Sequence, residues 1–213
     1  ETEGKLIELI KLNKFKKKMF SCEINAIQKT GSKYKTFKFF QKNFIPTIKT
    51  FNKKKINFSI SKTWVVKPDD GAGCEKNFIF TDKKKLLNFL SENKKFVVQP
   101  LIKGESYSAN IISFDKKAII LNYNKQQIFY KKRKIIFKGT KYIKSIPNED
   151  KIKKNINIIF KKLSGLNNFF GIDFIICKRK IFFMDINPRI TTSYKNIRKN
   201  LKLNLAKKIL NTL

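Results

Sequence analysis

The sequence predicts an α+β fold in which antiparallel strand pairs predominate. Some segments place apolar residues at every second position, which is typical of strands, and others place them three or four positions apart, which is typical of helices. The two kinds of segment are mixed without strict alternation, and several neighbouring strand segments are joined by short turns. This order favours antiparallel pairing over a doubly wound parallel sheet.

Helices are predicted where apolar residues recur at helical spacing or where a capping residue precedes such a run. Ser32 and Asp82 are of the types preferred at the N-cap, and each precedes an apolar helical segment. The expected helices are 6–15, 25–28, one that starts after Ser32 and ends before Ile45-Pro46, 82–93, 152–163 and 194–213.

Strands are predicted where β-branched and aromatic residues cluster between turn residues. Two of the expected pairs are hairpins with short connections. The expected strands are 19–22, 63–67, 77–81, 96–102, the hairpin 107–114 with 118–124, and the hairpin 171–177 with 181–186.

The size and apolar content of the chain fit one substantial domain or two small lobes with a shared core. The chain has 213 residues, of which 41% are hydrophobic and 13% aromatic. That is enough apolar material for a packed core, so global disorder is excluded. No apolar run approaches the roughly 20 residues that a membrane helix needs, and the first residues do not form a signal peptide.

The number of cysteines and histidines limits the kinds of catalysis that the chain can perform. The chain has three widely separated cysteines and no histidine. This composition indicates neither a disulfide framework nor a zinc site, and we interpret it as that of a protein from the reducing cytoplasm. Without histidine, catalysis by Ser-His or Cys-His pairs is excluded. Any chemistry therefore rests on carboxylates, lysine, arginine, backbone amides and a bound ion.

The chain is strongly basic. Its 49 Lys and Arg residues against 15 Asp and Glu give a formal net charge of +34. Such a field attracts nucleic acid, anionic membranes and phosphate-bearing ligands. However, the lysines are scattered along the whole chain rather than gathered in one tail. We therefore favour compositional drift toward A- and T-rich codons over a dedicated nucleic-acid surface, and we expect no membrane partner.

A lysine followed by a glycine-rich loop lies between two predicted strands, in Lys67-Pro68-Asp69-Asp70-Gly71-Ala72-Gly73-Cys74. It is not a Walker loop, because the lysine precedes the glycines and no helix follows. Gly71 and Gly73 permit a close approach of the backbone to a ligand, so their amides can hold phosphate oxygens beside the charge of Lys67. An ordinary hairpin with a glycine turn explains the same residues.

Two aspartates are predicted to face each other in the last hairpin. With its turn centred on Arg179, antiparallel pairing places Asp173 opposite Asp185, and the period of two places Asn187 on the same face. Like charges in an otherwise apolar hairpin, beside Ile175 and Phe183, need a counter-charge.

A divalent cation supplies that counter-charge most simply. Carboxylate and amide oxygens suit Mg²⁺, which also keeps water and nucleotide phosphates in its shell. The alternative is a solvent-facing acid pair neutralised by nearby lysines, and we favour the metal. Arg189 follows directly, and its planar guanidinium can bind a carboxylate or an acyl phosphate.

A third segment, Val98 to Ser106, joins an apolar strand to Gly104-Glu105. Such a hinge can present backbone groups to an adenine edge, and Glu105 can accept hydrogen bonds from ribose hydroxyls. A strand followed by a turn explains the segment equally well.

Taken together, these segments resemble the ATP-grasp superfamily, and most closely its ligases of the tyramine–glutamate ligase type. The order of lysine with glycine loop, hinge strand and paired acid strands carries the resemblance. The similar stretches are 1–4, 33–36, 45–47, 67–75, 104–108, 121–126, 171–173 and the most specific one, Asp185-Ile186-Asn187-Pro188-Arg189-Ile190-Thr191-Thr192-Ser193.

The resemblance implies two α+β lobes that hold ATP between them, and a ligase that joins a carboxylate to an amine through an acyl phosphate, with glutamate and an aromatic amine such as tyramine as substrates. The resemblance also implies which residues bind ATP, the metal ion and the reaction intermediate. They are Lys33 and Lys67 for the phosphates, Gln99, Pro100, Leu101 and Ile102 for the adenine, Asp173, Asp185 and Asn187 for Mg²⁺ or Mn²⁺, and Arg189 with Lys125 for the reacting groups.

The resemblance also implies a division of the chain into domains, and the sequence departs from the family's pattern at several positions. Residues 1–31 are expected to be the tail of a truncated N-terminal domain, 32–100 the first lobe with its linker helix and 101–213 the second lobe. Asp185 stands where the family usually has Glu, Lys125 where Arg is common, and Ser106 where many members have the ribose carboxylate. Two alternatives follow: a weakened scaffold that binds nucleic acid, or a ligase that is inactive without a complete N-terminal domain.

Overall fold

The computed structural model describes residues 3–12, 21–53, 56–71, 73–114 and 116–201. The predicted strand residues Met19 and Phe20, and the predicted helical residues 202–213, lie outside these ranges. Within them the chain has the α+β architecture with antiparallel strand pairs that its sequence predicts. None of the described helices has the length and apolar character needed to cross a membrane.

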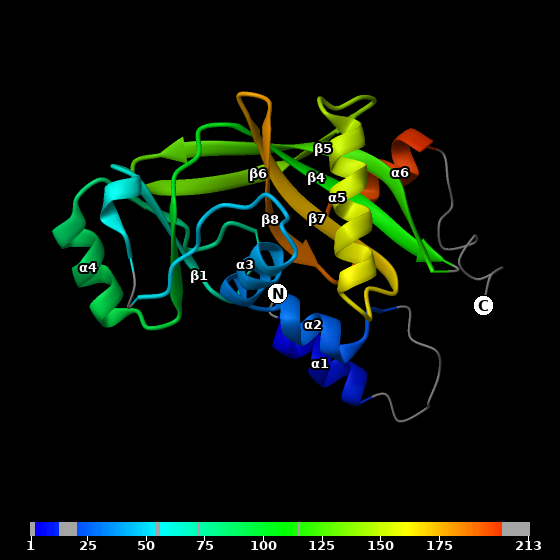
Figure 1. Cartoon of the computed structure of the whole chain (residues 1–213), viewed down its shortest axis with the longest axis horizontal. Coiled ribbons are helices and arrows are strands. Elements are labelled where there is room, and N and C mark those ends of the chain that lie inside the picture. Colours follow the sequence, from blue (N-terminus) through cyan, green and yellow to red (C-terminus); the bar gives the residue numbers. More distant parts are fainter. Residues whose placement is uncertain (1–2, 13–20, 54–55, 72, 115, 202–213) are drawn as a thin grey trace.

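One eight-stranded sheet runs through the described part of the chain, in the order β3-β1-β2-β6-β5-β4-β7-β8 (Figure 1). All neighbouring strands in it are antiparallel. The strands are β1 (Trp64–Pro68), β2 (Phe78–Phe80), β3 (Phe96–Pro100), β4 (Glu105–Phe114), β5 (Lys117–Lys131), β6 (Lys134–Ile143), β7 (Asn168–Cys177) and β8 (Lys180–Asn187).

Six α-helices and a short 3-10 helix, η1 (Phe58–Ile60), are described. The two predicted N-caps are confirmed, since the side chains of Ser32 and Asp82 accept hydrogen bonds from the backbone amides of Lys35 and Lys85. The α-helices are α1 (Glu3–Lys11), α2 (Ile24–Thr30), α3 (Lys33–Lys42), α4 (Lys83–Glu92), α5 (Glu149–Lys162) and α6 (Tyr194–Leu201).

The smaller half of the fold contains β3, β1 and β2 with α4 packed against them. Its core is apolar and largely aromatic, and Trp64 makes edge contacts with Phe51 and Phe58. Leu86 and Leu90 of α4 are four residues apart, so both lie on the face that this sheet covers. This half stands at one end of the molecule (Figure 1).

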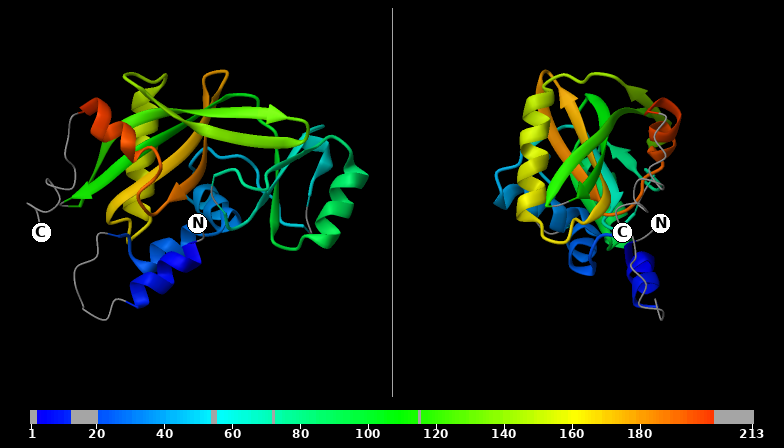
Figure 2. Two further views of the ribbon diagram at one scale, coloured as in Figure 1. Left: turned by 180° about the vertical axis from the view of Figure 1, so that it is seen from behind. Right: turned by 90° about the vertical axis from the view of Figure 1, so that its right-hand side faces the viewer.

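The larger half contains β6, β5, β4, β7 and β8, with helices on both sides. Helix α5 covers one face, where Ile152, Ile156 and Ile159 pack in the main core with residues of β4 and β7. Helix α6 covers the opposite face, where Ile197 packs on Phe169. Figure 2 shows α5 and α6 on opposite sides of the strands.

The two halves join through a narrow strand contact between β2 and β6. Only Phe78 and Lys134 pair as strand residues there. Two backbone hydrogen bonds flank the pair, from the Ile79 amide to Arg133 and from the Ile135 amide to Asn77. Strand β6 was not predicted from the sequence, because lysines and Gly139 interrupt its apolar pattern.

A one-residue bulge in β8 determines which side chains of this strand face the α5 side of the sheet and which face the opposite side. The β7–β8 turn is a two-residue turn of Lys178 and Arg179, both with positive φ, which pairs Phe174 with Phe183. The register then shifts by one, so Asp173 pairs with Asp185 as predicted. As a result Phe183 is buried on the α5 side, whereas the prediction placed it beside the aspartates; Met184 lies there instead.

Replacing Gly165 with Ala is expected to destabilise the protein by about 1–3 kcal/mol. The φ of Gly165 is +88°, and an added Cβ would lie 2.4 Å from Asn25 Oδ1 and 2.9 Å from Glu23 Cβ. Gly4→Ala is the matched control, since nothing lies within 4 Å of its Cβ position. Urea denaturation measures both variants, and equal midpoints would contradict the expectation.

Candidate functional site

A cavity of about 400 Å³ lies between the two halves of the fold. On the side of the larger half, it is lined by the face of the sheet that points away from α5. This is a typical volume for a small-molecule site. The strands of the larger half contribute polar side chains at every second position to this face. They are Ser106 and Ser108 of β4, Gln126 of β5, Asp173 of β7, and Asp185 and Asn187 of β8.

The two aspartates meet on this face as a pair. Asp173 accepts hydrogen bonds from Asn187 Nδ2 at 3.0 Å and from Gln126 Nε2 at 2.9 Å. Asp185 pairs with Asp173 across the strands and lies 3.8 Å from Lys33 Nζ. The three predicted metal-binding residues are therefore together, and Gln126, which was not predicted, supports them.

Burial and mutual repulsion disfavour ionisation of the aspartates. Burial, and then the charge of Asp185, raise the pKa of Asp173 to about 6. Burial raises the pKa of Asp185 as well, although the charges of Lys33 and Lys67 oppose this effect. A cation bound between the two carboxylates would remove the repulsion and lower both pKa values.

Without a divalent cation, the pair is expected to make stability depend on pH. Because the pKa of Asp173 is about 6 in the fold against an ordinary 3.8, its contribution is fully present below pH 4 and is lost as pH rises through 6. The raised pKa of Asp173 corresponds to a contribution of roughly 3 kcal/mol at most.

This expectation is measured as the free energy of unfolding of wild type and Asp173→Asn between pH 4 and 8 in a chelator. Asn cannot ionise, so the variant should gain stability relative to wild type as pH rises. Parallel curves would contradict the expectation.

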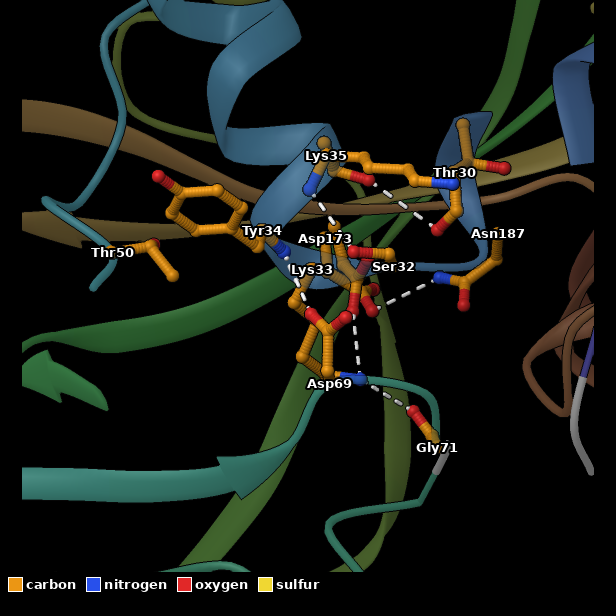
Figure 3. A network of polar contacts seen from close by, with 12 residues as sticks. Thr30, Ser32, Lys33, Tyr34, Lys35, Thr50, Asp69, Gly71, Asp173 and Asn187 are labelled. Carbon is orange, nitrogen blue, oxygen red and sulfur yellow. Dashed lines mark hydrogen bonds and ion pairs between the residues drawn. The ribbon is translucent and has the colours of Figure 1, made fainter. Parts of the chain in front are cut away.

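Two lysines face the aspartates. Lys33, at the start of α3, donates to the Gly71 carbonyl at 2.7 Å (Figure 3). Its Nζ also lies 3.8 Å from Asp185 Oδ2. Lys67 is on β1, where burial and then the charge of Lys33 lower its pKa. Two cations held near each other in a cavity favour an anionic ligand.

The loop after β1 lines the cavity with Gly71 and Gly73, both of which were predicted. Gly73 has a φ of +66°, a conformation that glycine adopts without strain. Gly71 points its carbonyl, rather than an amide, at Lys33. Ala72 lies outside the described residues.

The predicted hinge borders the same cavity on its apolar side. Gln99, Pro100, Leu101 and Ile102 all line it, together with Val65, Ile175 and Met184. Gln99 is fixed by a 2.7 Å hydrogen bond from its Nε2 to Thr50 Oγ1. This part of the cavity is suited to a flat apolar group with polar edges.

The structure does not bring Glu105 and Lys125 into the cavity. Glu105 begins β4, so by strand alternation it shares a face with Tyr107, which is buried in the main core. Glu105 forms an ion pair with Lys125 and accepts a 2.5 Å hydrogen bond from Tyr107 Oη. Ser106, one residue later, lines the cavity instead. The geometry therefore supports neither Glu105 at a ribose nor Lys125 at the reacting groups.

Arg189 follows the end of β8 and lines the cavity, as do Thr191, Thr192 and Ser193. Behind these residues lies a buried polar network that was not predicted. In it Asn110 Oδ1 accepts from Thr191 Oγ1 at 2.8 Å and from Ser193 Oγ at 2.9 Å. The signal for it was a polar residue at every second position, in 106, 108 and 110 and again in 122, 124 and 126.

The residues present fit a magnesium ion. Two carboxylates and one amide converge, and Mg²⁺ is usually bound by one or two carboxylates together with water and phosphates. With Asn187 Nδ2 turned to Asp173, its Oδ1 is the atom that a cation would meet. No group of three or more Cys, Asp or Glu residues suited to a metal occurs among the described residues.

A lysine-and-glycine loop, a hinge and an acid hairpin, arranged around one cleft between two sheet-containing halves, define the ATP-grasp class. The chain belongs to this family, since the ATP-grasp domain model matches residues 30–193.

Two curated relatives and one solved structure extend the comparison. The chain is 32% identical over 194 residues to tyramine–L-glutamate ligase of Methanocaldococcus fervens, covering 91% of this chain and 57% of that protein. It is also 32% identical over 204 residues to the ligase of the same name from Methanocaldococcus jannaschii, covering 95% and 58% respectively. The chain thus spans a little more than half the length of these relatives.

The fold is shared with N5-carboxyaminoimidazole synthetase from Staphylococcus aureus, solved in complex with ADP. The TM-score is 0.72 with 15% identity, over 91% of this chain and 53% of that one.

Proposed function

We propose that the cavity binds Mg·ATP and that the chain activates a carboxylate for amide formation with an amine. One observation carries the proposal: two lysines, a glycine loop and two carboxylates with an asparagine converge in a single cavity beside an apolar hinge. Cationic, carboxylate-rich and apolar surfaces suit the phosphates, the cation and the adenine of Mg·ATP respectively.

In the proposed complex the adenine lies against the apolar hinge, and Lys33 and Lys67 neutralise the phosphates. Asp173, Asp185 and Asn187 would hold Mg²⁺, which would supply positive charge to offset the negative charge that develops on the phosphates. The lysines meanwhile keep the phosphates in place as fixed charges, because both are held inside the cleft.

A carboxylate is a poor electrophile, so the proposed reaction first transfers the terminal phosphoryl group of ATP to the substrate carboxylate. ADP leaves, and the amine attacks the acyl phosphate, forming the amide and releasing phosphate. Arg189 would stabilise the acyl phosphate through its planar guanidinium. No histidine is needed, because positioning and charge stabilisation account for most catalysis of phosphoryl transfer.

Glutamate and an aromatic amine such as tyramine are the substrates that we propose to test first. Their support is the similarity to the two methanogen ligases, whose names state this pair. The test measures ADP release against a panel of amino acids and amines, with and without Mg²⁺. Hydroxylamine in place of the amine should trap the acyl phosphate as a hydroxamate; ADP release without hydroxamate would count against this intermediate.

We further propose the division of the chain into residues 1–31, from an N-terminal domain, and lobes 32–100 and 101–213. The narrow junction between β2 and β6 supports a division into two lobes, although one sheet runs through both. Helix α3, within the proposed first lobe, packs in the core of the larger half through Phe40, so the boundary at residue 32 does not coincide with the boundary between the two cores. A longer natural chain that gains turnover over this one would support the assignment of residues 1–31.

We propose small molecules rather than nucleic acid as partners, despite the net charge of +34. The alternative, a basic scaffold that binds nucleic acid, predicts affinity that falls steeply as salt rises. Tight binding of duplex or single-stranded DNA or RNA at physiological salt would favour that alternative.

A further inference from the structure

Asp69, which no proposed step uses, connects the two halves of the fold beside the phosphate end of the cavity. It follows β1 directly, and its backbone amide donates to the Lys95 carbonyl at 2.9 Å, next to the start of β3. These contacts fix Asp69 to the sheet of the smaller half. Its other contacts reach helix α3, which packs against β8 in the larger half through Phe40 and Phe183.

At the start of α3, Asp69 satisfies two of the backbone amides that a helix leaves without a partner. The Lys33 amide donates to the Asp69 carbonyl at 2.9 Å, and the Tyr34 amide donates to Asp69 Oδ1 at 2.9 Å. The next amide, of Lys35, donates to Ser32 Oγ at 3.1 Å. Ser32 and Asp69 thus divide the capping of one helix between a local residue and a distant one (Figure 3).

The two caps differ in what they hold. Ser32 precedes the helix, and its side chain accepts a hydrogen bond from the first turn of that helix. Asp69 belongs to the loop that continues to Gly71, whose carbonyl accepts a hydrogen bond from Lys33 Nζ at 2.7 Å. Lys33 is therefore held at its backbone by Asp69 and at its ammonium by Gly71, and that ammonium lies 3.8 Å from Asp185.

We propose that Asp69 is a positioning residue, which locks the glycine loop to the start of α3 and so places Lys33 over the aspartate pair. The consequence for nucleotide binding rests on the proposed function, whereas the mechanical link between loop and helix does not. Charge contributes as well, because a carboxylate at a helix N-terminus interacts favourably with the helix dipole.

The test compares Asp69→Ala with Ser32→Ala, the matched control that removes the other cap of the same helix. Both changes should lower the midpoint of thermal unfolding. Only Asp69→Ala should also raise the Kd for Mg·ATP, by about tenfold, in isothermal titration calorimetry. Asp69→Asn, which keeps an oxygen at the Oδ1 position, should recover most of the affinity. Equal Kd values for Asp69→Ala and Ser32→Ala would overturn the proposal.

A double-mutant cycle shows whether Asp69 acts through Lys33. If it does, Asp69→Ala should raise the Kd less than twofold when Lys33 is already Met, because the group that it positions is gone. The same tenfold loss in both backgrounds would mean that Asp69 does not act through Lys33 and would overturn the proposal.

A measurement without nucleotide separates this inference from the proposed function. Hydrogen exchange of the Lys33 amide, which donates to the Asp69 carbonyl, should be faster in Asp69→Ala than in wild type and less affected by Ser32→Ala. Equal exchange in the two variants would overturn the link. Failure of wild type to bind Mg·ATP would overturn the proposed function, and the exchange rates would still decide the role of Asp69.

Discussion

Replacing Asp185 with Asn is expected to lower kcat/KM for ATP by about 100-fold or more. The change keeps the size of the side chain but removes one of the two charges proposed to hold Mg²⁺, and it leaves Lys33 without the carboxylate 3.8 Å away. Calorimetry should show a matching loss of affinity for Mg·ATP. For Asp173→Asn, the loss should become smaller as pH falls below 6, because Asp173, with a pKa of about 6, is then mostly protonated in the absence of metal.

Asp150→Asn is the control for this experiment, because Asp150 is an exposed residue of α5 outside the cavity. Asp150→Asn changes the net charge of the protein by the same amount as Asp185→Asn. If Asp185→Asn retained the ATP turnover and affinity of Asp150→Asn, the metal assignment would be wrong.

Replacing Lys67 with Met is expected to have the second large effect, a loss of about 100-fold or more in phosphoryl transfer. Met has a similar length, so the cavity should keep its shape while it loses a cation. The charge of Lys67 also opposes the raised pKa values of Asp173 and Asp185, so both pKa values should rise further in the variant. The pH at which Mg·ATP binding is half-maximal should therefore move upward.

Lys84→Met, an exposed position on α4, is the matched control for the general effect of charge. In a chain of net charge +34, the loss of one distant lysine should matter little. A pH profile and turnover of Lys67→Met that match those of Lys84→Met would exclude Lys67 from the site.

The sequence predicted the elements whose signals are local. Ser32 and Asp82 were recognised as caps because the capping interaction involves residues three positions apart. The pairing of Asp173 with Asp185 was also predicted, but with the hairpin turn centred on Arg179. In the structure the turn is centred between Lys178 and Arg179. The bulge near Met184 compensates for that offset, and nothing in the spacing of the hairpin reveals it.

What the sequence did not reveal depends on where strands begin and on distant contacts. Glu105 was read as part of a hinge, but β4 already starts there, so alternation turns Glu105 away from the cavity and Ser106 toward it. The role of Gln126 depends on pairing between β5, β4 and β7, which no short pattern encodes. Strand β6 depends on its neighbours β5 and β2 more than on its own apolar pattern.

The bulge in β8 makes residue 184 one whose identity, and even presence, matters little to the faces of that strand. Another apolar residue in place of Met184 would leave Asp185 and Asn187 on the cavity face and Ile186 in the core. Loss of residue 184 would remove the bulge, and regular alternation would still place Asp185 opposite Asp173 and Ile186 in the core. An added residue would instead exchange the two faces beyond it, bringing Ile186 into the site and a carboxylate into the apolar interior. Selection on this hairpin is therefore expected to tolerate substitution or loss of residue 184 and no insertion.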